Sequence, residues 1–282
     1  MRLAELLALC RRELDARGLP SVPDADIVAS HLSGVPRSRL FIEAGRDVGN
    51  PSRALADMVR RRASGEPLQY VLGSWDFYGR EFLLSRDTLI PRPETEGLVE
   101  RAIGALRVSG RDAALVLDVG TGCGAIAVTL AAELPRARVV AVDVSAGALA
   151  VAAGNARRAG VGDRVLFVRA DAYSALKTGG RFDVVVSNPP YVSEGEWDAL
   201  PREVRDFEPP GALLAGPDGL SVIRRLVSGA AEHLLPAGVF LCEIGETQGE
   251  AVRRLPAGFL SFDGVFKDLA GRDRVARWTK TE

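Results

Sequence analysis

The chain from Leu115 onward alternates short, valine-rich apolar runs with longer stretches of helical spacing. Apolar runs of this length predict strands that are buried on both faces of a sheet. The predicted strands cover residues 115–119, 138–142, 164–168, 182–187, 239–243, 264–269 and 275–279. The predicted helices cover residues 122–134, 145–159, 220–235 and 247–255. This alternation indicates an α/β fold with a doubly wound, mostly parallel sheet, and the last two strands indicate an antiparallel hairpin at one edge.

Before Trp75 the apolar positions follow a helical period. The first helix is predicted by apolar residues at i, i+3 and i+4 spacing, with Gly18 and Pro20 at its end: Leu3, Leu6, Leu7, Cys10 and Leu14. A second helix is predicted from Asp24 or Asp26 to His31, a third from Pro36 to Glu43, and a fourth from Asn50 to about Ala63. In the fourth, Asn50 is the expected N-cap and Pro51 the expected first helical residue. We therefore expect a small all-helical domain.

Residues 75–84 alternate around Gly79, which predicts a β-hairpin between two domains. After it, the two prolines of Leu89-Ile-Pro-Arg-Pro-Glu-Thr-Glu96 stiffen the chain, and Thr95 or Glu94 can cap a helix over residues 96–106. The predicted domain organisation is a helical domain over 1–73, a β-hairpin linker over 74–90, and the α/β domain over 91–282.

Composition and charge narrow the class of protein. The 282 residues are 47% hydrophobic with a net charge of −1, which gives no strong field toward nucleic acid or membranes. Cys10, Cys123 and Cys242 share no metal-ligand spacing, so we expect a reduced cytoplasmic protein without a disulfide or a metal site. No apolar run is long enough to span a bilayer, and the N-terminus reads as an amphipathic helix rather than a signal peptide. The cluster Arg60-Arg61-Arg62 fits a solvated helix face or a docking patch for an acidic or RNA-bearing partner.

The turn after the first predicted strand of the α/β domain has the composition of a ligand-binding loop. It reads Asp118-Val-Gly120-Thr121-Gly122-Cys123-Gly124, and its glycines let a ligand approach the backbone at a helix start. The spacing also fits a loose dinucleotide fingerprint or a plain tight turn. A carboxylate at Asp118 suits the ammonium of a methionine moiety and would repel a pyrophosphate. The turn therefore favours S-adenosylmethionine over a nicotinamide dinucleotide.

Two further carboxylates follow the next strands. Asp143 lies 19 residues after Gly124, where a carboxylate can grip ribose hydroxyls, although it could equally cap the helix that starts near Ser145. Asp171 can accept a hydrogen bond from an adenine amino group, with Ala172 and Tyr173 beside the ring, or it can serve as a cap. Together with Asp118, these positions predict an S-adenosylmethionine site.

The segment Ser187-Asn188-Pro189-Pro190-Tyr191 follows a buried strand. The prolines stiffen the backbone and leave the carbonyls of Asn188 and Pro189 without a required internal partner. An amide oxygen, free carbonyls and an aromatic ring form an acceptor site for a planar NH₂ group. We expect Asn188 to lie across from Gly120–Gly124, near the transferable methyl group.

These motifs resemble a known family. Gly120–Gly124 with Asn188-Pro-Pro-Tyr191 is similar to class I methyltransferases that modify planar NH₂ nitrogens, and residues 90–96 with Phe207-Glu208-Pro209 narrow the resemblance to the PrmC/HemK family, the peptide chain release factor N5-glutamine methyltransferases. The resemblance implies a Rossmann-like catalytic domain and a helical domain that docks the release factor. Ala172 departs from the larger side chain often found in relatives.

The resemblance implies transfer of a methyl group from S-adenosylmethionine to the glutamine of a Gly-Gly-Gln motif. The expected catalytic residues are Asn188, Pro189 and Tyr191. The expected cofactor-binding residues are Asp118, Gly120, Thr121, Gly122, Cys123, Gly124, Asp143, Asp171, Ala172 and Asn188. The expected substrate-binding residues are Asn188, Pro189, Pro190, Tyr191, Arg92, Glu94 and Thr95.

Other functions use the same loop. An N6-adenine nucleic-acid methyltransferase would present it to adenine, but would need a basic groove that the net charge does not suggest. A nucleotide-sensing domain without catalysis, and more distantly an NAD oxidoreductase, are further alternatives. We expect a monomer that contacts neither nucleic acid nor membrane.

Overall fold

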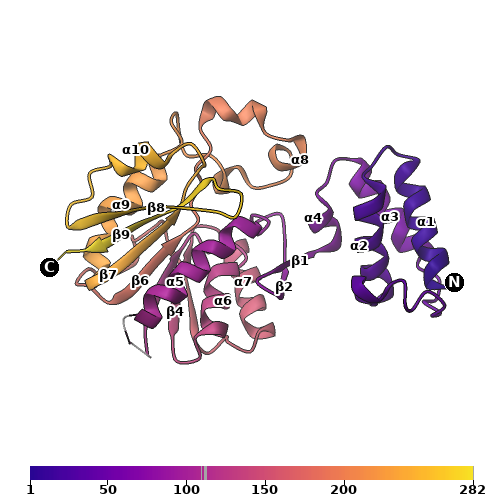
Figure 1. Ribbon diagram of the computed structural model, residues 1–282, viewed down its shortest axis with the longest axis horizontal. Coiled ribbons are helices and arrows are strands. Elements are labelled where there is room, and N and C mark those ends of the chain that lie inside the picture. The colour runs from indigo at the N-terminus through magenta and orange to yellow at the C-terminus, as the bar shows by residue number, and fades with distance from the viewer. Residues whose placement is uncertain (109, 111–112, 282) are drawn as a thin grey trace. The chain divides into compact units, whose positions relative to one another are not determined.

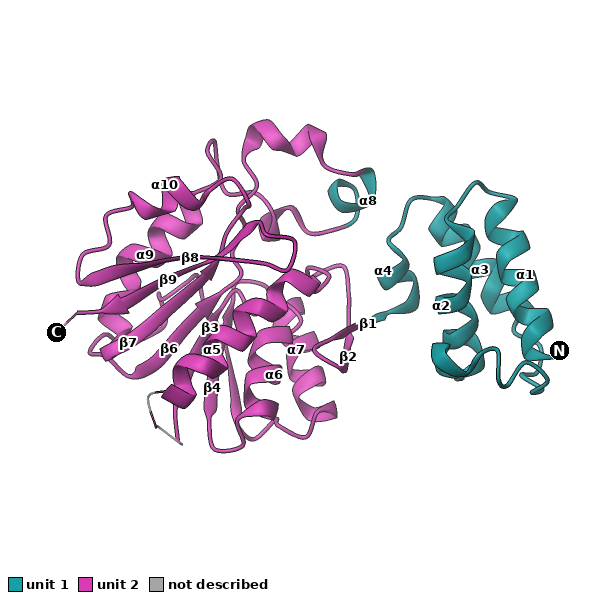
Figure 2. Ribbon diagram, viewed as in Figure 1, with its two compact units in different colours: residues 1–74, 202–207 teal, residues 75–201, 208–282 magenta. Residues whose placement is uncertain are grey.

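The computed structural model describes residues 1–108, 110 and 113–281 of the chain. They form two compact units, one of residues 1–74 and 202–207, and one of residues 75–201 and 208–282 (Figure 2). The first unit therefore includes a short segment, 202–207, that lies beyond the predicted boundary at residue 73. None of the helices in the described ranges combines the length and apolar character needed to cross a membrane.

The first unit is helical, as the periodicity predicts. Its helices are α1 (Leu3–Asp15), α2 (Ser21–Ser33), α3 (Ser52–Ala63), α4 (Leu68–Leu72) and α8 (Arg202–Arg205). Leucines of α1 are buried against α2 and α3 in a core that also contains Cys10. Because these apolar side chains repeat with the helical period, α1 buries one continuous stripe.

Three local predictions in this unit were wrong in detail. The second helix starts at Ser21, before either aspartate. The third is reduced to a single 3-10 turn over Arg37–Arg39. The helix α3 begins at Ser52, and Asn50 Oδ1 accepts hydrogen bonds from the Ser52 backbone and hydroxyl, so Asn50 closes the turn before the helix. Helix boundaries of this kind depend on the surrounding packing as well as on the local turn residues.

The arginine cluster is engaged within the first unit. Arg61 donates to both oxygens of the Glu66 carboxylate, at 2.9 and 2.8 Å. Arg62 pairs with Asp24 at 3.3 Å and with Glu203 at 3.1 Å. Arg62 thus links α3 to the 202–207 segment, and the cluster is not simply a solvated face.

The second unit is built on a seven-stranded sheet within the described residues, in the order β5-β4-β3-β6-β7-β9-β8 (Figure 1). The first five strands are parallel to one another, whereas β9 is antiparallel to both β7 and β8. The strands are β3 (Leu115–Val119), β4 (Arg138–Asp143), β5 (Val165–Arg169), β6 (Phe182–Ser187), β7 (Leu234–Glu243), β8 (Leu260–Lys267) and β9 (Asp273–Lys280). The doubly wound sheet and the antiparallel edge hairpin are confirmed.

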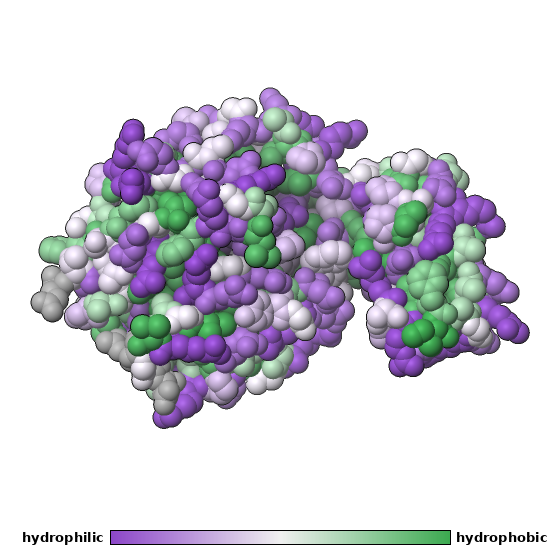
Figure 3. Space-filling model, viewed as in Figure 1, coloured by the Kyte–Doolittle hydropathy of each residue, from purple (hydrophilic) through white to green (hydrophobic). Residues whose placement is uncertain are grey.

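Helices cover both faces of this sheet. On one face are α5 (Glu96–Val108), α6 (Ala125–Glu133) and α7 (Ala146–Arg158); on the other are α9 (Ser221–His233) and α10 (Gly249–Arg253). Side chains of one strand alternate between the two cores, with Val116 in the first and Leu117 in the second. Burial on both faces explains why the strands read as continuous apolar runs. On the visible surface, hydrophilic residues dominate and apolar ones are scattered (Figure 3).

The predicted β-hairpin is present as β1 (Ser74–Phe77) and β2 (Arg80–Leu83). Its turn residues, Tyr78 and Gly79, have φ of 51° and 70°, the left-handed pair that matches strand twist in a two-residue hairpin. Phe77 and Phe82 pack edge to face in the core beneath α5, with ring centroids 6.0 Å apart. The hairpin strand β2 thus packs as part of the second unit.

Candidate active site

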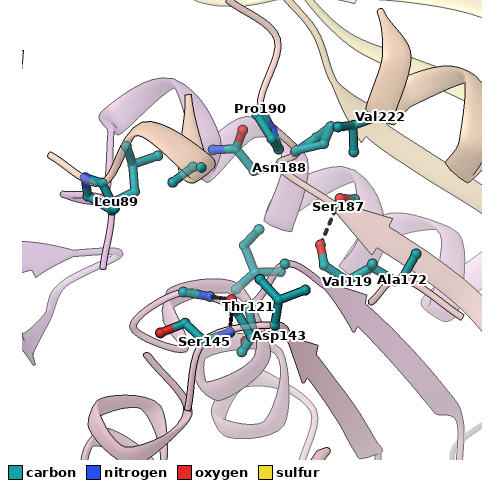
Figure 4. A pocket seen from close by; sticks show the side chains of 18 of the residues that line it. Leu89, Val119, Thr121, Asp143, Ser145, Ala172, Ser187, Asn188, Pro190 and Val222 are labelled. Atoms are coloured by element: carbon teal, nitrogen blue, oxygen red, sulfur yellow. Dashed lines mark hydrogen bonds between the residues drawn. The ribbon is translucent and has the colours of Figure 1, made fainter. Parts of the chain in front are cut away.

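A cavity of about 370 Å³ lies at the carboxyl ends of β3, β4, β5 and β6. The strand order reverses at β3, which pairs with β4 on one side and β6 on the other. Ligands of open α/β sheets bind at this switch point because the loops after the two central strands diverge there. Asn188 and Pro190 lie on one side of the cavity and Thr121 and Asp143 on the other (Figure 4).

The glycine turn forms one wall of the cavity. Gly120, Thr121, Gly122 and Cys123 line it, and the backbone N–H groups of Gly120 and Thr121 donate to the Val142 carbonyl at 2.8 and 3.0 Å. Gly124 does not line it. A Cβ there would meet the Ala152 Cβ at 3.0 Å, so this glycine lets α6 pack closely on α7.

Asp118 lies beneath this turn. Its carboxyl is fully buried, its Oδ2 accepts a hydrogen bond of 2.6 Å from the Thr121 hydroxyl, and it is not among the cavity-lining residues. Burial raises its pKa from 3.8 to about 7. The expectation was that this carboxylate faces a ligand directly, but in the structure Thr121 lines the cavity and Asp118 does not. Strand alternation is the reason, because Asp118 shares the side of β3 that faces α6.

Asp143 lines the cavity at the end of β4. Its Oδ2 accepts from the Gly122 N–H and its Oδ1 from the Ser145 N–H, both at 2.9 Å (Figure 4). The side chain that caps α7 is that of Ser145, which accepts from the Ala148 N–H at 3.1 Å. Asp143 thus ties two loops together, and each carboxylate oxygen keeps a second lone pair for a ligand.

Asp171 and Ala172 line the next part of the wall. Both Asp171 oxygens accept hydrogen bonds from Arg225 of α9, at 2.8 and 2.6 Å. Arg225 also lines the cavity and was missed in the sequence, because nothing distinguishes it from other charged residues of an amphipathic helix. Tyr173 was expected, with Ala172, to line the adenine ring, but Tyr173 does not line the cavity. Its ring stacks on His233 at 4.7 Å, away from the cavity, because its hydroxyl donates to the Leu226 carbonyl.

The Asn188 loop forms the opposite wall, with Asn188, Pro189 and Pro190 lining the cavity. The Ser187 hydroxyl donates to the Val119 carbonyl at 2.7 Å and so joins the ends of β6 and β3. A Cβ on Gly120 would lie 4.0 Å from the Asn188 carbonyl oxygen, so the two loops meet as expected. The Asn188 Nδ2 donates to the Thr95 Oγ1 at 3.1 Å, and Thr95 also lines the cavity.

Three expected substrate-binding residues lie outside the cavity wall: Tyr191, Arg92 and Glu94. Tyr191 packs against the second core, and burial raises its pKa to about 12. Arg92 forms an ion pair with Glu208, whose carboxylate also accepts from the Ile90 N–H at 3.2 Å. The Pro-Arg-Pro and Phe-Glu-Pro motifs are thus paired with each other, and they position Pro91 and Pro209 on the cavity wall.

Comparisons with known proteins place this chain in a family. Residues 5–73 match the model of the PrmC N-terminal domain, and residues 104–202 match that of the methyltransferase small domain. The release factor glutamine methyltransferase of Nitratidesulfovibrio vulgaris is 42% identical over 277 residues, which cover 96% of this chain and 93% of that protein. The enzyme of the same name from Bordetella pertussis is 44% identical over 92% of this chain and 94% of its own. The chain belongs to the release factor glutamine methyltransferase family.

Solved structures agree on the fold of this methyltransferase. A Pyrococcus furiosus methyltransferase matches with a TM-score of 0.51 and 18% identity, over 82% of this chain and all of that one. The Thermus thermophilus 16S rRNA methyltransferase, solved with AdoMet and guanosine, matches with a TM-score of 0.52 and 22% identity, over 73% of this chain and 49% of that one. At these identities the likeness concerns the fold, which is that of the class I methyltransferases.

S-adenosylmethionine is the cofactor of this family, and the cavity has the features to hold it. The loop carries no side chain at Gly120 and Gly122, and a Cβ on Gly122 would meet nothing within 4 Å, so the backbone is open to a ligand. Asp143 and the Arg225–Asp171 pair supply polar groups along the same wall. Within the described residues, no group of three or more His, Cys, Asp or Glu could hold a metal ion.

Glu243 is the second residue that sequence reasoning missed in this methyltransferase. It ends β7 with a 1% exposed side chain, and its carboxylate hydrogen-bonds with the Thr95 side chain. Burial raises its pKa from 4.5 to about 7. A signal was present, because a carboxylate that ends an otherwise apolar buried strand is unusual unless it has a partner.

Proposed function

We propose that this protein transfers a methyl group from S-adenosylmethionine to the side-chain amide nitrogen, N5, of the glutamine in the Gly-Gly-Gln motif of class-1 peptide chain release factors. The observation that carries the proposal is the hydrogen bond from Asn188 Nδ2 to Thr95. Because Thr95 takes the amino end of the amide, the Oδ1 of Asn188 is left to accept from a substrate. The backbone carbonyl of Asn188 lies beside Gly120, and both residues line the cavity that would receive the methyl donor.

The donor side of the reaction falls to the glycine turn and its neighbours. When bound, S-adenosylmethionine supplies an electrophilic methyl group on a sulfonium. Gly120 to Cys123 approach it through their backbone, Asp143 accepts from ribose hydroxyls, and Asp171 with Ala172 flanks the adenine. Asp118 acts through Thr121, whose hydroxyl it holds. Gly124 contributes by letting α6 pack against α7.

The acceptor side falls to the Asn188 loop. A carboxamide nitrogen is a poor nucleophile because its lone pair is delocalised into the carbonyl. Asn188 Oδ1 and the Pro189 carbonyl oxygen accept hydrogen bonds from the two N–H groups of the substrate amide. These bonds orient the amide nitrogen toward the methyl group. Such orientation lowers the activation free energy by up to about 7–11 kcal/mol in well-aligned systems, and fixed acceptor dipoles lower it further.

Three of the residues expected to bind substrate lie outside the cavity wall, and two of them stabilise it. Arg92 holds Glu208 and thereby Pro209, and Tyr191 anchors the end of the loop in the core. Glu94 is exposed and is proposed to contact the release factor together with the helical unit. We further propose a cytoplasmic monomer that contacts the factor as protein and makes no direct nucleic-acid contact.

The test is mass spectrometry of a purified release factor after incubation with the enzyme and S-adenosylmethionine. We expect one added methyl group, on the glutamine of Gly-Gly-Gln. A factor with that glutamine replaced by alanine is the matched control and should gain none. Methyl transfer to adenine of DNA or RNA oligonucleotides, with none to the factor, would overturn the proposal in favour of an N6-adenine methyltransferase.

A further inference from the structure

Glu243 and Asn188 occupy equivalent places on neighbouring strands. β6 and β7 are parallel, and Ser187 pairs with Cys242, so Asn188 and Glu243 each follow a paired position. Glu243 is buried to 1% exposure, and no described residue donates a hydrogen bond to its Oε2. A buried carboxylate that is only partly satisfied is costly, which calls for a reason for its presence at the wall of an active site.

Thr95 connects the two residues. Its Oγ1 accepts from Asn188 Nδ2 at 3.1 Å, and its side chain hydrogen-bonds with the Glu243 carboxylate. A threonine hydroxyl has one proton to donate. When ionised Glu243 accepts that proton, Thr95 can offer Asn188 only a lone pair. Asn188 must then present its NH₂ to Thr95, which leaves its Oδ1 for the substrate.

We propose that Glu243 is a positioning residue, which fixes the amide orientation of Asn188 by taking the only hydroxyl proton of Thr95. This inference rests on the proposed function, because it concerns the acceptor that holds the substrate amide. It adds a residue on a different strand to the site and gives Thr95 a role beyond its place at a helix start.

The opposite protonation state reverses the arrangement. Protonated Glu243 donates its own proton to Thr95 Oγ1, and the Thr95 hydroxyl proton then turns toward Asn188. The amide rotates to accept it, and an NH₂ group replaces Oδ1 at the substrate. Two NH₂ groups then face each other, so the substrate amide keeps only the Pro189 carbonyl as an acceptor and is no longer held in the orientation for transfer.

In addition to its hydrogen bond with Thr95, Glu243 is influenced by several charged groups. Arg274 of β9 and Arg92 lower its pKa and Glu94 raises it, while burial is the largest cause of the pKa of about 7. The Tyr191 hydroxyl and the Cys242 thiol also interact electrostatically with Glu243, and both remain protonated in this range because burial raises their own pKa values. Glu243 is therefore the group of this cluster expected to titrate near neutral pH.

The test compares Thr95→Val, which removes the hydroxyl and keeps the shape, with Thr95→Ser, which keeps the hydroxyl. We expect Thr95→Val to lower kcat for release factor methylation by about tenfold to one hundredfold, the scale of a misoriented group, without changing the Kd of S-adenosylhomocysteine. Thr95→Ser should retain most of the activity. A Thr95→Val enzyme with the kcat and pH profile of the wild type would overturn the inference.

The pH dependence of kcat is a second test, because a purely structural role of Glu243 would not affect it. The wild-type kcat should fall as the pH drops below about 7, as Glu243 takes up its proton. Glu243→Gln keeps an acceptor oxygen but removes the titration, and should flatten this acidic limb. Persistence of the same limb in Glu243→Gln would contradict the role of Glu243.

Nitrogen-15 NMR of the Asn188 side chain tests the orientation without turnover. The NH₂ resonances of Asn188 should shift with pH in the wild type and lose that shift in Glu243→Gln, with the unlinked Gln69 side chain as reference. If the wild-type enzyme methylates no release factor but the resonances titrate, the proposed function fails and the inference about Asn188 stands. If methylation occurs and the resonances are insensitive to pH, the inference alone fails.

Discussion

Arg225 donates hydrogen bonds to both carboxylate oxygens of Asp171, at 2.8 and 2.6 Å, on the wall of the cofactor cavity. The pair comes from α9 and from the loop after β5, and both side chains are about half exposed. An exposed pair of this kind contributes little to the stability of the fold. Its position suggests instead that it sets the orientation of the Asp171 carboxylate toward the adenine of the cofactor.

Replacing Arg225 by alanine should therefore weaken cofactor binding and leave stability almost unchanged. We expect the Kd of S-adenosylhomocysteine to rise by about threefold to tenfold, equivalent to about 1 kcal/mol, in isothermal titration calorimetry. Arg224→Ala is the matched control, because Arg224 is the neighbouring residue and pairs with Asp218 away from the cavity. Equal effects of the two variants would contradict the assignment.

Replacing Asn188 by alanine should remove the acceptor of the substrate amide. We expect kcat for the release factor to fall by about one hundredfold to one thousandfold, the scale for loss of one preorganised polar group. The Kd of S-adenosylhomocysteine should stay near the wild-type value. Steady-state kinetics with labelled S-adenosylmethionine measure the first quantity and calorimetry the second. Near wild-type turnover in this variant would show that Asn188 has another role.

Two glycines of the same turn should respond differently to alanine. At Gly124 a Cβ would lie 3.0 Å from the Ala152 Cβ, and the φ of 85° adds strain. Gly124→Ala should lower the free energy of unfolding by about 2–4 kcal/mol in urea denaturation. Gly122 has open space around it, so Gly122→Ala should cost less stability, about 1–2 kcal/mol, but raise the Kd for the cofactor. Adding Ala152→Gly should recover part of the loss in Gly124→Ala only.

Asp118 should make the stability depend on pH. Its pKa rises from 3.8 to about 7 on folding, so between these values the folded state holds a proton that the unfolded state has released. The free energy of unfolding contributed by this group is therefore highest at low pH and declines as the pH rises through that range. Asp118→Asn removes the decline and should be more stable than the wild type at about pH 8, by up to about 4 kcal/mol.

Urea denaturation of the two proteins at a series of pH values measures this difference. The gap between Asp118→Asn and the wild type should widen steadily from acid to neutral pH. Thr129→Val, at a buried position of α6 that carries no titratable group, is the control and should keep a constant gap. A gap of the opposite sign would mean that the ionised Asp118 is stabilised in the folded protein more strongly than burial opposes it.

The strands and most helices of the second unit were predictable because each is specified by its own residues. β3 and β6 have the predicted bounds, since a valine-rich run between turn residues permits little else. Helix starts in the first unit were less predictable. Ser21 and Ser52 lie where one or two polar residues could equally well begin a helix, so the surrounding packing decides.

The location of the site was also predictable, since residues at the carboxyl ends of parallel strands converge at one edge of the sheet. Asn188, Asp143 and the first glycines follow strand ends and do line the cavity. Tyr191, Arg92 and Asp118 belong to the same motifs but face other parts of the protein. The position of these residues in the motifs predicted the loop that each one occupies. It did not predict the direction in which each side chain points.

The amino-acid sequence by itself thus determined the strand–helix order, the two loops at the switch point and the family. Only the tertiary structure decided the partners: Arg225 with Asp171, Arg92 with Glu208, and Glu243 with Asn188 through Thr95. The physical reason is the range of the forces involved. Period and turn chemistry act between neighbours along the chain, whereas hydrogen bonds between buried groups depend on which strands the fold brings together.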